Sequence, residues 1–120
     1  MRSNKKALTE RPFRSNLERL FANGLSVYQI KWEYEPRSFK VSVNGVACYW
    51  TPDFYLPDLN LYVEIGCQNF DGKKKRLKIK SFRKAYPLIR MLELSSKEID
   101  RGYVYYVQVV LLNESRTQSP

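Results

Sequence analysis

The N-terminal part of the chain carries the pattern of a capped amphipathic helix. Ser15 and Glu18 stand three residues apart, as in a capping box, and the apolar residues that follow recur with helical spacing. Asn23-Gly24 is typical of a helix C-terminus, because glycine readily adopts the left-handed conformation found there. We therefore expect a helix that begins at Ser15 and stops at Asn23-Gly24.

The middle of the chain alternates between apolar and polar residues with the period of β-strands. Residues 30–34 and 39–43 show this pattern, and further strands are expected over residues 46–51 and 61–65. Asn44-Gly45 lies between the second and third of these strands and is the strongest hairpin signal in the sequence, because both residues tolerate the positive φ of a tight turn. We expect these strands to form an antiparallel meander.

A strongly basic helix is expected next, between Asp71 and Pro87. The residues that follow a helical spacing within it are Lys75, Ile79, Phe82 and Tyr86. The pattern then predicts a strand before the next capping signal.

The last part of the chain predicts alternating strands and helices. A strand is expected over residues 88–94, and Ser95 and Glu98 form a second capping box that opens a short helix ending at Gly102. A long β-branched and aromatic run, residues 103–112, predicts a final strand. The predicted order is α-βββ-α-β-α-β, which is a mixed α/β (α+β) domain with a central mixed sheet flanked by helices.

Length and composition place these elements in one domain. The 120 residues fit a single domain, and a hydrophobic fraction of 43% is too high for a disordered chain. We expect the domain over residues 14–113, between a basic flexible arm of residues 1–13 and a flexible tail of residues 114–120. No apolar run approaches the roughly 18 residues of a membrane span, and the first residues lack the apolar segment of a signal peptide. A cytoplasmic location is therefore the expectation.

The net charge and the residue types of the chain limit the classes of partner and of catalysis that are possible. The formal net charge is +9, which favours a polyanionic partner, first a nucleic acid and second a membrane surface. The chain has no histidine, which excludes Ser-His-Asp and Cys-His catalysis and the usual zinc sites. Its two cysteines, Cys48 and Cys67, suggest no disulfide framework. Any catalysis must therefore use carboxylates, lysines, tyrosines or a bound metal.

Two acidic residues stand where the pattern predicts strands. Asp53 follows Pro52 at the end of one predicted strand, and Glu64 interrupts the apolar run of residues 61–65. Because adjacent antiparallel strands lie about 4.8 Å apart, the two carboxylates can converge on one point. A divalent cation would remove their repulsion, and hard oxygen ligands suit Mg²⁺ or Mn²⁺. An ion pair with lysine or arginine, exposure at a sheet edge, or a turn role for Asp53 would also account for these acids.

The same region of the sequence carries a family resemblance. The segments that carry it are SNLE at residues 15–18, YEP at 34–36, TPDFYLP at 51–57 and LYVEI at 61–65. Together they resemble the PD-(D/E)XK nuclease superfamily, which has the restriction-endonuclease-like fold, over residues 15 to about 93. This superfamily includes restriction enzymes, Holliday-junction resolvases, homing endonucleases and small phage nucleases, and the small size of the chain would suit a phage or a mobile element.

The resemblance implies roles for the matching residues. Asp53 and Glu64 would be metal ligands, together with the main-chain carbonyl of Ile65. Glu18 would lie near the metal, which would be Mg²⁺ or Mn²⁺.

One position departs from the family pattern. The family's lysine stands two residues after the acid, where this chain has Gly66. Either a lysine has moved to the following helix, or the protein is a relative that does not cleave, or the position has been changed deliberately. Lys78 is the first candidate for a moved lysine, because it flanks the apolar stripe of that helix. Lys74 is the second candidate, and the amide of Gln68 is the third.

These features together predict a divalent-metal-dependent DNA endonuclease, specific for a site or for a DNA structure. A homodimer is expected if both strands are cut, because one domain of this size covers little DNA. The basic residues expected to hold DNA lie on the predicted helix and are Lys73, Lys74, Lys75, Arg76, Lys80 and Arg83. A non-catalytic DNA-binding or assembly subunit is the first alternative. A basic RNA-binding or RNA-processing module is the second.

Overall fold

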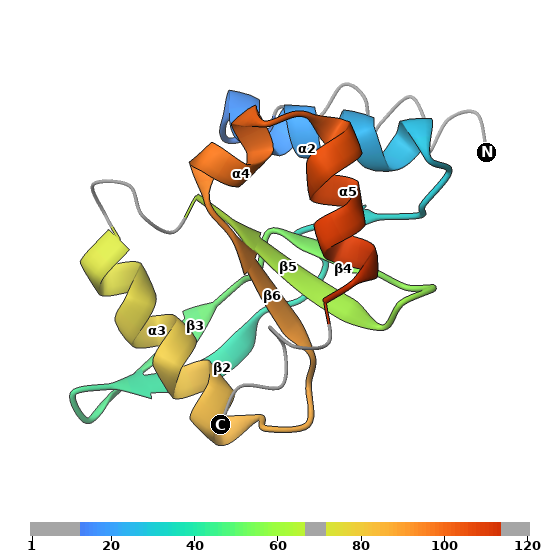
Figure 1. Ribbon diagram of the computed structural model, residues 1–120. Coiled ribbons are helices and arrows are strands. Elements are labelled where there is room, and N and C mark those ends of the chain that lie inside the picture. Colours follow the sequence, from blue (N-terminus) through green and yellow to red (C-terminus); the bar gives the residue numbers. More distant parts are fainter. Residues whose placement is uncertain (1–12, 67–71, 114–120) are drawn as a thin grey trace.

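A four-stranded mixed sheet runs through the middle of the computed structural model, which describes residues 13–66 and 72–113. In spatial order its strands are β1 (Glu33–Tyr34), β4 (Phe54–Leu56), β5 (Leu61–Ile65) and β6 (Met91–Leu94). The pairs β1–β4 and β4–β5 are antiparallel, whereas β5 and β6 are parallel. A parallel pair needs a crossover connection, and the helix between these two strands supplies it (Figure 1).

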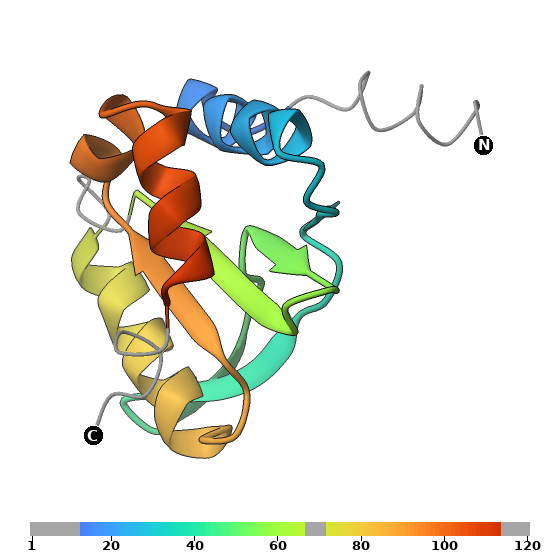
Figure 2. The same cartoon turned by 45° about the vertical axis from the view of Figure 1, so that its right-hand side comes forward.

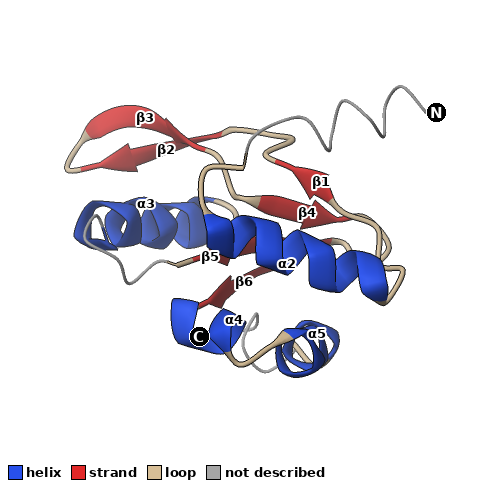
Figure 3. Cartoon of the chain, turned by 90° about the horizontal axis from the view of Figure 1, so that it is seen from above, coloured by secondary structure: helices blue, strands red, loops and turns tan. Residues whose placement is uncertain are grey.

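Helices cover both sides of this sheet. They are α2 (Asn16–Val27), α3 (Gly72–Ala85), α4 (Ser96–Asp100) and α5 (Tyr103–Leu111). Seen from above, α4 and α5 lie on one side of β5 and β6, and α3 lies on the other side (Figure 3). The predicted fold class, a mixed α/β domain with a mixed sheet between helices, is confirmed at this level.

The hairpin predicted at Asn44-Gly45 is confirmed, but it stands apart from the central sheet. β2 (Phe39–Val43) and β3 (Val46–Trp50) form a two-stranded sheet of their own, and the turn residues have φ of 54° and 79°. The antiparallel partner of β5 is β4, which has three residues and is too short to show an alternating pattern. The expected continuous meander is therefore wrong in this respect.

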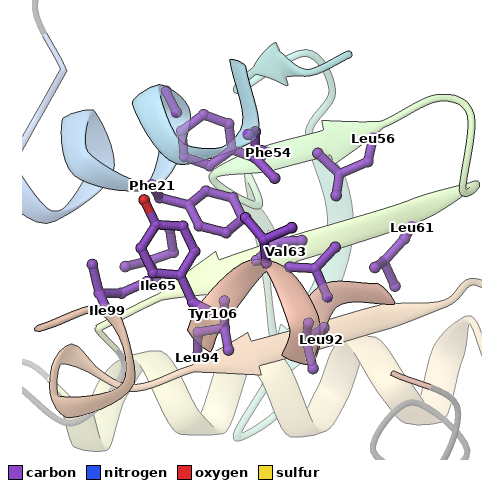
Figure 4. Packing of buried hydrophobic residues seen from close by; sticks show 14 of the residues in the cluster. Phe21, Phe54, Leu56, Leu61, Val63, Ile65, Leu92, Leu94, Ile99 and Tyr106 are labelled. Carbon is purple, nitrogen blue, oxygen red and sulfur yellow. The ribbon is translucent and has the colours of Figure 1, made fainter. Parts of the chain in front are cut away.

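The sheet separates two hydrophobic cores. Side chains alternate along β5, so that Leu61, Val63 and Ile65 enter the core shared with α2, α4 and α5 (Figure 4). Tyr62 enters the second core, between the sheet, α3 and the hairpin. Glu64 projects from the same side of β5 as Tyr62, which points it toward α3.

The first helix runs past its predicted end. Gly24 lies inside α2, and α5 packs against this helix (Figure 2). A Cβ atom at Gly24 would overlap the phenol of Tyr106 and lie 2.7 Å from Cβ of Tyr103. Glycine here permits close helix packing, and the chain leaves the helix only near Gln29, whose φ is 60°.

The predicted last strand, residues 103–112, is wrong, because this segment forms α5. Its buried residues Tyr106, Val107 and Val110 have helical spacing and pack into the first core. β-Branched and aromatic residues favour strands only weakly, and packing against α2 overrides that preference. The capping box of Ser95 and Glu98 before α4 is confirmed.

Some predictions fall on residues that the structure does not describe. The predicted arm, except for Phe13, and the predicted tail are among them, as are Cys67, Gln68 and Asp71. Of the helices in the described ranges, none is both long and apolar enough to cross a membrane.

Candidate functional site

Asp53 and Glu64 lie side by side at the end of the central sheet, as their spacing predicts. The β4–β5 register pairs Phe54 with Val63, which places the preceding Asp53 beside Glu64. The amide of Ile65 donates to Asp53 Oδ2 at 2.8 Å, and the amide of Asp53 donates to Glu64 Oε1 at 3.1 Å. Both residues are buried, at 6% and 1% exposure. The sheet backbone therefore holds two carboxylates in adjacent positions.

This burial makes the charged forms of both acids unfavourable. Loss of solvent raises the pKa of Asp53 to about 8, and the neighbouring Glu64 charge adds to this effect. Loss of solvent also raises the pKa of Glu64, although Lys75 opposes the change. The pair therefore needs a compensating cation in order to be fully ionised.

Lys75, in the first turns of α3, supplies one such cation. Its Nζ lies 2.7 Å from Glu64 Oε2 and donates to the carbonyl oxygen of Ile65 at 3.1 Å. The sequence signal for this contact is the helical spacing that aligns Lys75 with Ile79 and Phe82, both of which are buried in the second core. A lysine aligned with a buried stripe points toward the protein interior.

The two lysines favoured from the sequence lie in the same cleft but make other contacts. Lys78 Nζ donates to the carbonyl oxygen of Tyr49 at 3.2 Å, and Lys74 is exposed on the wall of the cleft. Of these three lysines, Lys75 is the one that is ion-paired with Glu64.

Glu18 of α2 lines the same cleft and is held there by Tyr34 of β1. Its Oε1 accepts hydrogen bonds from the hydroxyl of Tyr34 at 2.8 Å and from the amide of Arg14 at 2.8 Å. Ser15 caps α2 through the Glu18 amide, so the predicted helix start is confirmed. Burial and the Glu18 charge raise the pKa of Tyr34, which keeps its hydroxyl protonated as a donor. Sequence reasoning placed Glu18 near the acids but missed its contact with Tyr34.

These residues line a cleft of about 700 Å³. Acidic residues form one part of its lining, and these are Glu18, Asp53 and Glu64. Basic residues form another part, and these are Arg14, Lys74, Lys75 and Lys78. Tyr49 of β3 also lines the cleft, and 63% of it is exposed. The cleft thus combines a buried acidic centre with basic walls.

The residues predicted to hold DNA divide into two groups. Four are exposed on α3, namely Lys73, Lys74, Arg76 and Lys80. The other two are partly buried and ion-paired within the protein, since Lys75 contacts Glu64 and Arg83 contacts Glu93 Oε2 at 3.0 Å. Arg83 also donates to the carbonyl oxygen of Met91, which ties α3 to β6.

The oxygen atoms around Glu64 have the chemistry of a site for a hard divalent cation. The carboxylates of Asp53 and Glu64 and the carbonyl of Ile65 are the ligand types that Mg²⁺ and Mn²⁺ prefer. Burial raises the pKa of both acids, and a bound cation would favour their charged forms. Within the described ranges, no three His, Cys, Asp or Glu side chains gather into one metal-binding group. The fit therefore rests on two carboxylates and one carbonyl.

In comparisons with protein-family models, curated proteins and solved structures, nothing matches this chain. The geometry of the cleft is therefore the basis for inferring its function.

The backbone conformation at Gly66 explains why this position is glycine. Its φ is +69°, in the left-handed region, and its amide donates to the carbonyl oxygen of Leu94 at 2.8 Å. A Cβ atom there would meet Leu17 Cδ1 at an ordinary 3.7 Å. The requirement for glycine is therefore conformational rather than steric.

We expect Gly66→Ala and Gly66→Lys to lower the free energy of unfolding by about 1 to 2 kcal/mol, the cost of a left-handed L-residue. Gly66→Asn should lose less, because asparagine enters the positive-φ region more readily. Urea unfolding of the three variants and the unchanged protein measures these free energies of unfolding. Equal stability of the alanine variant and the unchanged protein would contradict the backbone explanation.

The buried acids also predict how stability depends on pH. The native Asp53 keeps its proton to a higher pH than the unfolded chain does, so the metal-free protein should lose stability as pH rises from about 4 to about 8. Asp53→Asn removes this effect and should raise Tm in EDTA by at least about 4 °C at pH 8, and by much less at pH 5. Thermal unfolding at the two pH values tests this, with Asp58→Asn in an exposed turn as the matched control. A similar gain for both variants would refute the role of burial at Asp53.

Proposed function

We propose that this protein is a divalent-metal-dependent DNA endonuclease with a restriction-endonuclease-like arrangement, and that the cleft is its active site. The observation that carries the proposal is the convergence of Asp53, Glu64 and Lys75 at the floor of a cleft with basic walls. The family resemblance implies two carboxylates and a lysine at the active site, and here the lysine comes from α3 and contacts Glu64 of β5. The position of Lys75 supports the hypothesis that the lysine expected at position 66 has moved to the following helix.

Asp53, Glu64 and the carbonyl of Ile65 would hold the metal ion. When bound, a divalent cation supplies a Lewis acid for a phosphate oxygen and makes nearby water more acidic. The protein contributes rigid placement of these oxygens, because main-chain amides on neighbouring strands fix both carboxylates. Glu18, held by Tyr34 and the Arg14 amide, adds a third acidic side chain to the lining of the cleft.

Lys75 is the residue of this chain best placed to act on the phosphate. Its ammonium stands at the floor of the cleft, in contact with Glu64. From the cleft beside the acids, a lysine can neutralise charge that develops on a phosphodiester oxygen or orient an attacking water. The sequence favoured Lys78 for this role, but the Lys78 ammonium contacts Tyr49 instead.

The walls of the cleft suit a nucleic-acid backbone. Lys74 and Lys78 of α3 lie on one wall, and Arg14 lies near the start of α2. Such cations bind phosphates without regard to base sequence. The predicted homodimer is not tested by a single chain and stays a prediction.

The activity test is cleavage of plasmid, linear duplex, four-way-junction DNA and RNA, with Mg²⁺, Mn²⁺ or EDTA. We expect cutting of DNA that depends on the metal. Asp53→Asn and Glu64→Gln should each reduce the rate at least about 100-fold, the scale seen when one preorganised electrostatic group is lost. Asp58→Asn is the matched control, since this acid lies in an exposed turn outside the cleft.

Other outcomes of this assay would count against the proposal. DNA binding without cleavage under any metal would favour the non-catalytic subunit. Cleavage or binding that strongly prefers RNA at matched salt would replace DNA as the substrate. Cleavage that persists in Glu64→Gln would place the active site elsewhere.

The wall lysines predict a specific loss in DNA binding. The double variant Lys74→Ala/Lys78→Ala should weaken binding to all sequences alike and reduce the slope of log Kd against log salt by about 2. Fluorescence anisotropy at several salt concentrations measures both effects. Lys31→Ala/Lys97→Ala removes the same charge from exposed residues outside the cleft and is the control. An equal loss in both double variants would show only a general effect of net charge.

A further inference from the structure

Lys75 stands at the point where free oxygens of the acidic site converge. Its Nζ is 2.7 Å from Glu64 Oε2 and 3.1 Å from the carbonyl oxygen of Ile65. The amide contacts that hold the site use other atoms, Asp53 Oδ2 and Glu64 Oε1. A metal ion that binds Glu64 Oε2 and the Ile65 carbonyl therefore shares its position with the ammonium.

The ammonium and a divalent cation cannot hold these two oxygens together. Mg²⁺ binds oxygen at about 2.1 Å, so an ion on the same two oxygens would lie against Lys75 Nζ. Two cations in contact repel strongly at a site with little solvent. One of them has to leave.

Lys75 is the partner that can move. Its side chain is 23% exposed, whereas that of Glu64 is 2% exposed. The flexible four-carbon stem of lysine allows the ammonium to swing while the helix stays in place. Lys75 also lines the cleft beside Lys74 and Lys78, so solvent is within reach.

We propose that Lys75 is the resident counter-ion of this site, and that a divalent cation displaces its ammonium from Glu64 and Ile65 into the cleft. This inference rests on the proposed function only for the identity of the ion, Mg²⁺ or Mn²⁺. Without the metal, one ammonium faces two carboxylates. After the exchange, the divalent ion balances the carboxylates and the Lys75 ammonium can meet a phosphate in the cleft. Metal loading and phosphate binding would therefore assist each other.

Chemical labelling of the unchanged protein tests the displacement directly. Brief acetylation with acetic anhydride, in EDTA or with Mg²⁺ or Mn²⁺ and without DNA, is read at each lysine by mass spectrometry. We expect labelling of Lys75 to rise severalfold with metal, while labelling of Lys97, an exposed residue of α4, stays constant. Labelling of Lys75 that is unchanged or reduced by metal would overturn the proposal, because the ammonium would then stay in place.

Metal affinity gives an independent test. Lys75→Met should bind Mg²⁺ and Mn²⁺ about tenfold tighter or more by calorimetry, because a competing charge in contact with the site is gone. Lys78→Met is the matched control, since it removes a cleft lysine that contacts Tyr49 rather than the acids. An equal gain in metal affinity in both variants would refute direct competition at the site, because it would show only a general effect of net charge. If Lys75→Met does not fold, labelling of the unchanged protein still decides.

These measurements separate the inference from the proposed function. Displacement of Lys75 by metal without any DNA cleavage would support the counter-ion role of Lys75 and refute the nuclease function. Metal-dependent cleavage without displacement of Lys75 would support the nuclease function and refute the counter-ion role. Absence of metal binding in the unchanged protein and in Lys75→Met would refute the counter-ion and the metal dependence together.

Discussion

The candidate site depends on the placement of two carboxylates, Asp53 and Glu64, side by side in a nearly solvent-free position. Burial and mutual repulsion disfavour this arrangement, as the raised pKa values of both groups indicate. It persists because several surrounding elements hold it. The β4–β5 register brings the acids together, main-chain amides bind them, and α3 brings Lys75 to Glu64.

Packing in the second core determines why Lys75 lies beside Glu64. Ile79 and Phe82 of α3 are buried between the sheet and the hairpin, and this fixes the rotation of the helix. Arg83, near the other end of α3, binds Glu93 and the carbonyl of Met91, which fixes the helix against β6. The first turns of α3 then lie over Glu64. The hairpin β2–β3 therefore serves the site even though it does not join the central sheet.

A basic protein with an acidic centre is consistent with a nucleic-acid enzyme. The basic walls of the cleft would attract phosphates, and the acidic floor would hold a cation against them. Burial of these acids is predicted to lower stability, and the main-chain amides and Lys75 that bind them compensate in part. Gly66 adds a backbone constraint directly after Glu64, because its left-handed φ lets the chain leave β5 and still bond to Leu94.

Local patterns in the sequence were sufficient for the features that depend on local chemistry. The apolar run of residues 61–65 predicted β5, Asn44-Gly45 predicted the hairpin, and the spacing of Asp53 and Glu64 predicted their convergence. Tertiary contacts decided the rest. Gly24 lies within a helix because Tyr106 packs on it, and residues 103–111 are helical because that packing outweighs a weak strand preference. Lys75 rather than Lys78 reaches Glu64 because burial of the α3 stripe sets the rotation of the helix, and sequence spacing indicates a shared face but not what that face meets.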